Sequence, residues 1–317
     1  MKKQLALLLT ALFLPLAGSL PAFAEVESCH FLPQEYSYEG TAIEQARCLM
    51  RPVSKGGRLP ESAFPLPAPI ENLVGQPVSI DKQRFRDYLD KAGILENSLG
   101  GSLDDGLSYA NDGDINSRQA TYFVIHDTST PDYGKKAIPA NINSPAWKYN
   151  QLWRYPEVAH VFINRLGESA SKVNFNIPFR ATKYESKVVK EPAKGLYLHI
   201  ELLQPRRDQP RHYKKNNALI APSPGFTNAQ YKRLALVYTA ASLRGGRWLI
   251  PTFHAVVDFG LYDAHDDPQN FSREQFASEL LKLLKNLGAE ETKGLPAPPQ
   301  ANPAKPANKK QKTPHRR

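Results

Sequence analysis

The chain has 317 residues, a formal net charge of +10 and two cysteines. Two cysteines are too few for a disulfide-rich scaffold, and the length allows one large domain or a mid-sized domain with a smaller companion. Seven of the positive charges follow position 292, in a segment without acidic or aromatic residues. The rest of the chain is therefore nearly neutral, and nucleic-acid binding is not indicated.

Residues 1–24 have the pattern of a secretory signal peptide. Lys2 and Lys3 precede an apolar run, and Ala22-Phe23-Ala24 forms a small-x-small cleavage site. The run is too short, and too often interrupted by proline and glycine, to favour a membrane span. We therefore predict an exported protein, periplasmic or secreted, whose mature chain begins at Glu25.

Residues 25–115 are predicted to form an N-terminal accessory region. An oxidising compartment favours a disulfide between Cys29 and Cys48, and two buried thiols are the alternative. Closing a loop of about 20 residues would stabilise the fold by roughly 3 kcal/mol in the chain-entropy model. The proline-rich stretch from Pro60 to Pro77 is predicted to be an extended connector.

Beyond this connector, sequence periodicity predicts alternating helices and strands. Helices are expected over residues 80–95, 227–243 and 272–287, with Thr227 and Ser272 as caps and Gln275 as the capping-box partner of Ser272. Residues 97–117 are polar and predict a loop or boundary. Apolar runs predict buried strands over 121–125, 158–164 and 196–203. The alternation indicates an α/β fold.

Histidines and carboxylates are concentrated between His254 and Asp267, next to apolar runs. A catalytic zinc site needs three protein ligands and one open position. A further histidine, His126, ends the first predicted strand, and Glu201 lies within the third. Functional groups gather at the ends of neighbouring strands in α/β sheets, so these residues are expected to meet.

Five short motifs follow one another in this part of the chain: FVIHDTS at 123–129, AHVFINRLG at 159–167, LHIEL at 198–202, FTNAQY at 226–231, and His254 followed by Asp267-Pro268. In this order they resemble the zinc-dependent N-acetylmuramoyl-L-alanine amidases of the type-2 class, relatives of peptidoglycan-recognition proteins. The resemblance covers roughly residues 118–287. It implies a mixed central β-sheet flanked by helices, with a catalytic domain over residues 116–288.

The resemblance also implies roles for five residues. His126, His254 and Asp267 would bind Zn²⁺, and Glu201 would take a proton from the attacking water. His265 falls where many members have a lysine that stabilises the oxyanion or protonates the leaving amine. A histidine changes charge near neutral pH, so we expect the activity to depend on pH more strongly than with lysine.

Two departures from the family pattern leave the third ligand open. The gap between His254 and Asp267 is longer than usual, and Gln269 replaces a glycine that often follows the proline. An alternative ligand set is His126, His254 and His265, with Asp267 or Asp266 outside it. His160 and His199 are interpreted as structural residues, and His199 is expected to face away from Glu201.

The predicted function is hydrolysis of the amide between N-acetylmuramic acid and L-alanine in peptidoglycan or its fragments. One alternative is a protein of the same fold that binds muramyl peptides without cleaving them. Another is a zinc peptidase acting on stem peptides. All three candidate ligands are present, which favours the enzyme over the binding protein.

Residues 289–317 are rich in proline, alanine and lysine and contain almost no large apolar side chain. Such a segment cannot bury a core and is predicted to be a disordered tail. The tail either keeps the protein in solution or adheres to an anionic envelope surface.

Overall fold

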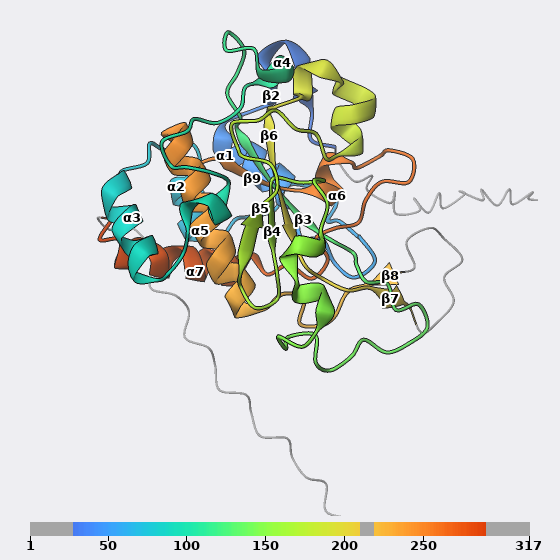
Figure 1. The fold of residues 1–317 in the computed structure, drawn as a ribbon. Helices are drawn as coiled ribbons and strands as arrows, with labels where there is room; N and C mark the ends of the chain where they lie inside the picture. Colours follow the sequence, from blue (N-terminus) through green and yellow to red (C-terminus); the bar gives the residue numbers. More distant parts are fainter. Residues whose placement is uncertain (1–27, 210–218, 290–317) are drawn as a thin grey trace, which may run out of the picture.

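A computed structural model describes residues 28–209 and 219–289 (Figure 1). The predicted signal peptide and the tail beyond Ala289 lie outside these ranges, so both remain predictions. Within the two ranges, no helix has the length and apolar character needed to cross a membrane.

A five-stranded sheet forms the centre of the fold, in the order β5-β4-β6-β3-β9. Its strands are β3 (Tyr122–Asp127), β4 (Val161–Ile163), β5 (Ser169–Ser171), β6 (Tyr197–Leu202) and β9 (Ile250–Phe253). Four of them are parallel, and β5 pairs antiparallel with β4 at one edge. All six residues of β3 are buried, as expected for a parallel strand covered on both faces. The predicted mixed sheet flanked by helices is confirmed.

The remaining elements surround this sheet. The helices are α1 (Ala42–Leu49), α2 (Ala68–Leu73), α3 (Lys82–Lys91), α4 (Ala110–Gly113), α5 (Asn228–Gly245), α6 (His254–Val257) and α7 (Arg273–Asn286). Two short ribbons pair β1 (Phe31–Leu32) with β2 (Ser37–Tyr38), and β7 (Arg207–Asp208) with β8 (Leu219–Ile220). Single helical turns are η1 (Pro33–Glu35), η2 (Glu96–Leu99), η3 (Lys148–Asn150), η4 (Leu152–Arg154), η5 (Tyr184–Val189) and η6 (Glu191–Ala193).

Opposite faces of the sheet are covered by different parts of the chain. On one face, Phe123 packs against Tyr238 of α5 with ring centroids 5.1 Å apart, and α5 lies beside α7 (Figure 1). On the other face, Tyr122 packs against Tyr38, 5.2 Å away, and donates a hydrogen bond to Gln45 of α1. Successive side chains of a strand point to opposite faces, so the N-terminal residues and α5 enclose β3 between them.

The two long C-terminal helices begin at the predicted caps. Thr227 and Gln230 form a reciprocal capping box at the start of α5. Ser272 accepts a hydrogen bond from the backbone N–H of Gln275 at the start of α7. The predicted return bond from Gln275 is not formed, because the backbone N–H of Ser272 donates to the Tyr231 hydroxyl instead.

The expectation of an extended connector from Pro60 to Pro77 is wrong in part, because α2 forms within it. Pro67 precedes this helix and Pro69 lies in its first turn, where a missing backbone N–H costs no intrahelical bond. Ile70 and Leu73 are buried and belong to the main core. This stretch therefore anchors the N-terminal residues rather than only spanning a distance.

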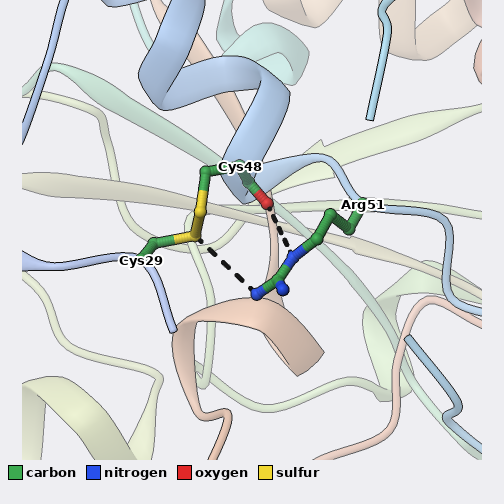
Figure 2. The surroundings of a disulfide bond; sticks show 3 residues. All are labelled: Cys29, Cys48 and Arg51. Carbon is green, nitrogen blue, oxygen red and sulfur yellow. Dashed lines mark hydrogen bonds between the residues drawn. A yellow bond between two sulfur atoms is a disulfide. The ribbon is translucent and has the colours of Figure 1, made fainter. Parts of the chain in front are cut away.

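The predicted disulfide between Cys29 and Cys48 is confirmed (Figure 2). It ties the start of the described chain to the end of α1. Arg51 is fully buried beside it: its Nε donates to the Cys48 carbonyl at 3.1 Å, and its Nη2 lies 3.9 Å from Cys29 Sγ. The disulfide thus fixes the segment that covers one face of the sheet.

Replacing both cysteines by alanine is expected to lower the free energy of unfolding by roughly 3 kcal/mol, because the unfolded chain regains the freedom of a loop of about 20 residues. Urea unfolding of both proteins under oxidising conditions measures this difference. Adding reductant should remove it, since wild type then loses the same cross-link. Equal midpoints without reductant would contradict the expectation.

Candidate metal centre

The predicted site residues meet at the carboxyl edge of the parallel sheet. His126 lies near the end of β3 and is paired in register with Glu201 of β6. Strand β9 ends at Phe253, so that His254 begins α6 at the same edge. Asp267 is tied to this edge by two bonds: its carboxylate accepts from the backbone N–H of Asp127, and its carbonyl accepts from that of Ala255.

His126, His254 and Asp267 form a buried cluster of potential ligands. The two Nδ1 atoms of the histidines lie 2.8 Å apart. Asp267 Oδ2 lies 3.3 Å from His254 Nδ1 and 3.8 Å from His126 Nδ1. Their side chains are at most 3 % exposed. Side chains from three separate segments therefore direct one donor atom each toward a common point.

The spacing and chemistry of these donors fit a zinc ion. Ligands about 2.0–2.1 Å from a tetrahedral zinc lie about 3.3 Å from one another, and the distances of 2.8, 3.3 and 3.8 Å among the two Nδ1 atoms and Asp267 Oδ2 fall around that value. Two imidazoles and one carboxylate are a donor set that zinc accepts in hydrolytic enzymes, with a fourth position left open.

The charges in the cluster are strongly coupled. Burial and the neighbouring His254 hold the pKa of His126 well below its ordinary value. Burial also lowers the pKa of His254, but the carboxylates of Asp267 and Asp258 outweigh this effect and raise it to about 10. Without metal, a proton on His254 thus neutralises carboxylates beside it. A divalent cation would compete with that proton, so binding is expected to release protons.

Glu201 borders this cluster and faces a pocket. Its Oε1 lies 3.9 Å from His126 Nδ1, and its Oε2 has no hydrogen-bond partner among the described residues. Burial raises the pKa of Glu201 well above its ordinary value, and the nearby Asp267 and Asp127 add to this shift. A buried carboxylate oxygen without a hydrogen-bond partner costs free energy unless a bound molecule interacts with it.

The pocket has a volume of about 400 Å³. Glu201, His254 and His265 line it together with residues of three other segments: Asp127, Thr128, Ser129, Glu157, Val158, Phe179, Arg180 and Ala181. One candidate donor, His254, therefore lines the same pocket as Glu201 and His265.

His265 lies at the edge of the cluster. Its side chain is 49 % exposed, its Nδ1 lies 3.5 Å from Asp267 Oδ1, and its ring is 4.3 Å from that of His254. The potential ligand atoms of His265 group with those of His254 and Asp258, in a second cluster that does not include His126. This geometry favours Asp267 over His265 as the partner of His126.

Three polar residues around the cluster were not predicted from the sequence. His199 Nδ1 lies 3.1 Å from His126 Nε2, Asp258 Oδ2 lies 3.0 Å from His254 Nε2, and Glu185 contacts His199. The expectation that His199 faces away from Glu201 is wrong, because residues two apart in a strand point to the same face. The four-residue spacing of His254 and Asp258 could have predicted their contact, because residues four apart lie on the same face of a helix. No sequence pattern pointed to Glu185.

His160 is also buried behind the cluster, and its Nδ1 accepts a hydrogen bond from the backbone N–H of His199. Burial, together with His199, lowers the pKa of His160 to about 3. In the unfolded chain a histidine binds a proton near pH 6.5. Below that pH the unfolded state therefore binds more protons than the folded state, and His160 makes the fold less stable as pH decreases toward 3.

Below pH 6.5 the free energy of unfolding of wild type should fall relative to that of His160→Asn, because asparagine does not titrate. We expect the difference between the two proteins to decrease by up to about 1.4 kcal/mol for each pH unit. The substitution keeps an acceptor near the position of Nδ1. Denaturant unfolding of both proteins between pH 4.5 and 8 measures this. A difference that stays constant over the whole range would show that His160 does not carry the effect.

These features define an α/β protein with a candidate metal centre at the carboxyl edge of its central sheet. No protein-family model matches the chain, and no curated protein matches it either. Among solved structures, the chain is similar to the crystal structure of a selenomethionine AmpD derivative, with a TM-score of 0.36 and 19 % identity, over 59 % of this chain and 99 % of that one. At this TM-score we draw no functional conclusion from the likeness.

Proposed function

We propose that this protein is an exported, zinc-dependent amidase that hydrolyses the bond between N-acetylmuramic acid and L-alanine in peptidoglycan or its fragments. One observation carries the reaction class: the cluster of His126, His254 and Asp267 lies beside Glu201, and Glu201 and His254 line one pocket. The choice of substrate rests on the five motifs that resemble the type-2 amidases.

In this proposal His126, His254 and Asp267 hold the metal. When bound there, zinc supplies Lewis acidity, which polarises a carbonyl oxygen and lowers the pKa of water. Glu201 takes the proton of the water whose oxygen attacks the amide carbon, and its raised pKa makes it a stronger base than an ordinary carboxylate. The carbon–nitrogen bond then breaks, and the leaving amine takes a proton from Glu201 or from His265 at the pocket edge.

The N-terminal residues have a supporting role in this proposal. We propose that residues 116–288 form the catalytic domain and that residues 25–115 brace it. The hydrogen bond from Tyr122 to Gln45, and that from Arg273 to the Pro65 carbonyl, join the two parts of the chain. We also propose that the segment beyond residue 289 meets an anionic envelope surface.

Incubating the purified protein with a soluble muramyl peptide, with zinc and separately with a chelator, tests the proposed activity. We expect the zinc-loaded protein to release a peptide that begins with L-alanine, and the chelator to stop the release. Binding without release would instead support a muramyl-peptide-binding protein. Products cut within the stem peptide would support a peptidase.

A further inference from the structure

We propose that His199 and the segment from Ala181 to Glu185 are the positioning elements of the metal centre. They would orient both ligand histidines so that each presents its Nδ1 to the metal. This inference rests on the metal site of the proposed function. It extends that site to His199, which the sequence alone indicated to be a structural residue, and to a segment outside the five motifs.

The first connection runs from His126 to Glu185. His126 Nε2 lies 3.1 Å from His199 Nδ1, and His199 Nε2 lies 3.2 Å from Glu185 Oε2. All three side chains are buried: His199 and Glu185 are 0 % exposed and His126 is 1 % exposed. Water does not reach these side chains, so their polar atoms depend on one another. The contact between His199 Nε2 and Glu185 Oε2 is an ion-pair contact, since this nitrogen has no hydrogen-bond partner among the described residues.

The position of the proton on each histidine of this series follows from metal binding at His126 Nδ1. If His126 uses the Nδ1 lone pair to bind a metal, its proton is on Nε2, and that N–H can only donate to His199 Nδ1. His199 then carries its own proton on Nε2, which faces the Glu185 carboxylate. The negative charge of Glu185 ends this series and attracts the Nε2 proton of His199. The arrangement therefore selects the one tautomer of His126 that leaves Nδ1 free.

The second connection runs from His254 to Asp258. His254 Nε2 lies 3.0 Å from Asp258 Oδ2, while its Nδ1 faces the metal cluster. Asp258 is itself held by the backbone N–H groups of Lys183 and Tyr184, at 3.3 and 2.9 Å. An ionised Asp258 in this position fixes the proton of His254 on Nε2 when a metal occupies Nδ1.

Both connections end on the same short segment. Glu185 Oε2 accepts hydrogen bonds from the backbone N–H groups of Ala181 and Thr182 and from the Thr182 hydroxyl, at 2.9–3.2 Å. The two backbone groups that hold Asp258 follow directly in the chain. One turn thus fixes both carboxylates that orient the ligand histidines. Ala181 also lines the pocket, so the turn joins the metal centre to the substrate side.

Two substitutions of His199 distinguish a role in orienting His126 from a role that is only to fill space in the core. Asparagine places its amide near the position of Nδ1 and keeps an acceptor for His126 Nε2, whereas glutamine places its amide near the position of Nε2 and removes that acceptor. We expect His199→Gln to weaken zinc binding by 10- to 100-fold, and His199→Asn to weaken it clearly less. Competition with a chromophoric zinc chelator measures both, without reference to activity.

The control is His30→Asn, because His30 is exposed and its contact with Glu39 lies at the surface. A folded His199→Gln protein that binds zinc as tightly as wild type would overturn the proposal, and so would equal losses for the two His199 variants. Nitrogen-15 NMR of zinc-loaded wild type gives a second readout, since the His126 proton should be found on Nε2. Failure of wild type itself to bind zinc would instead remove the metal site of the proposed function.

Discussion

Glu201→Gln is expected to lower the rate of amide hydrolysis by about 10²- to 10⁴-fold while leaving zinc binding close to that of wild type. Glutamine has nearly the size of glutamate but cannot take a proton from water. Glu201 lies beside the ligand cluster, with Oε1 3.9 Å from His126 Nδ1, and its Oε2 has no hydrogen-bond partner in the part of the chain that the structure describes. The substitution should therefore remove the base without removing a metal ligand.

The assay compares zinc affinity and hydrolysis of a muramyl peptide in the same preparations. Glu274→Gln is a matched control, because this glutamate is exposed in the first turn of α7, away from the pocket. A variant that loses zinc would show that Glu201 is a ligand. A variant that stays fully active would show that another group accepts the proton.

The strands were predictable because parallel strands in the middle of a sheet are buried on both faces. The apolar runs around Phe123 and Leu198 correspond to β3 and β6, whose residues are almost all buried. The segment 97–117 was harder to interpret, because its polar composition concealed Leu99, Leu103 and Leu107. These leucines recur every four residues and all three are buried in the core. Composition alone therefore did not reveal that this segment packs into the core.

Those site residues that lie within a motif could be predicted from the sequence. His126, Glu201 and His254 end or follow apolar strands, and parallel strands bring such ends to one edge. The residues that support the cluster could not be predicted in the same way. Glu185 reaches His199 from a turn far along the chain, and such a contact depends on the path of a loop that has no periodic pattern.

The second large effect is expected at the third ligand, where the sequence left two possibilities. Asp267→Ala should weaken zinc binding by more than the 10- to 100-fold that is typical of residues that only support a ligand. Asp267 is buried and its carboxylate lies within 3.8 Å of the Nδ1 atoms of both His126 and His254. Its loss leaves two imidazoles, which hold zinc less firmly than three donors.

His265→Ala should change zinc affinity less than tenfold and lower the rate of hydrolysis instead, because His265 is half exposed and its ligand atoms do not group with those of His126. Asp266→Asn is the matched control: this carboxylate is next in the chain but contacts Gln269 and Arg206 rather than the two histidines. Chelator competition on the three variants separates the possibilities. A large loss of zinc affinity in His265→Ala, with little loss in Asp267→Ala, would establish the alternative ligand set of three histidines. The metal would then lie nearer to the exposed His265 than to the buried Asp267.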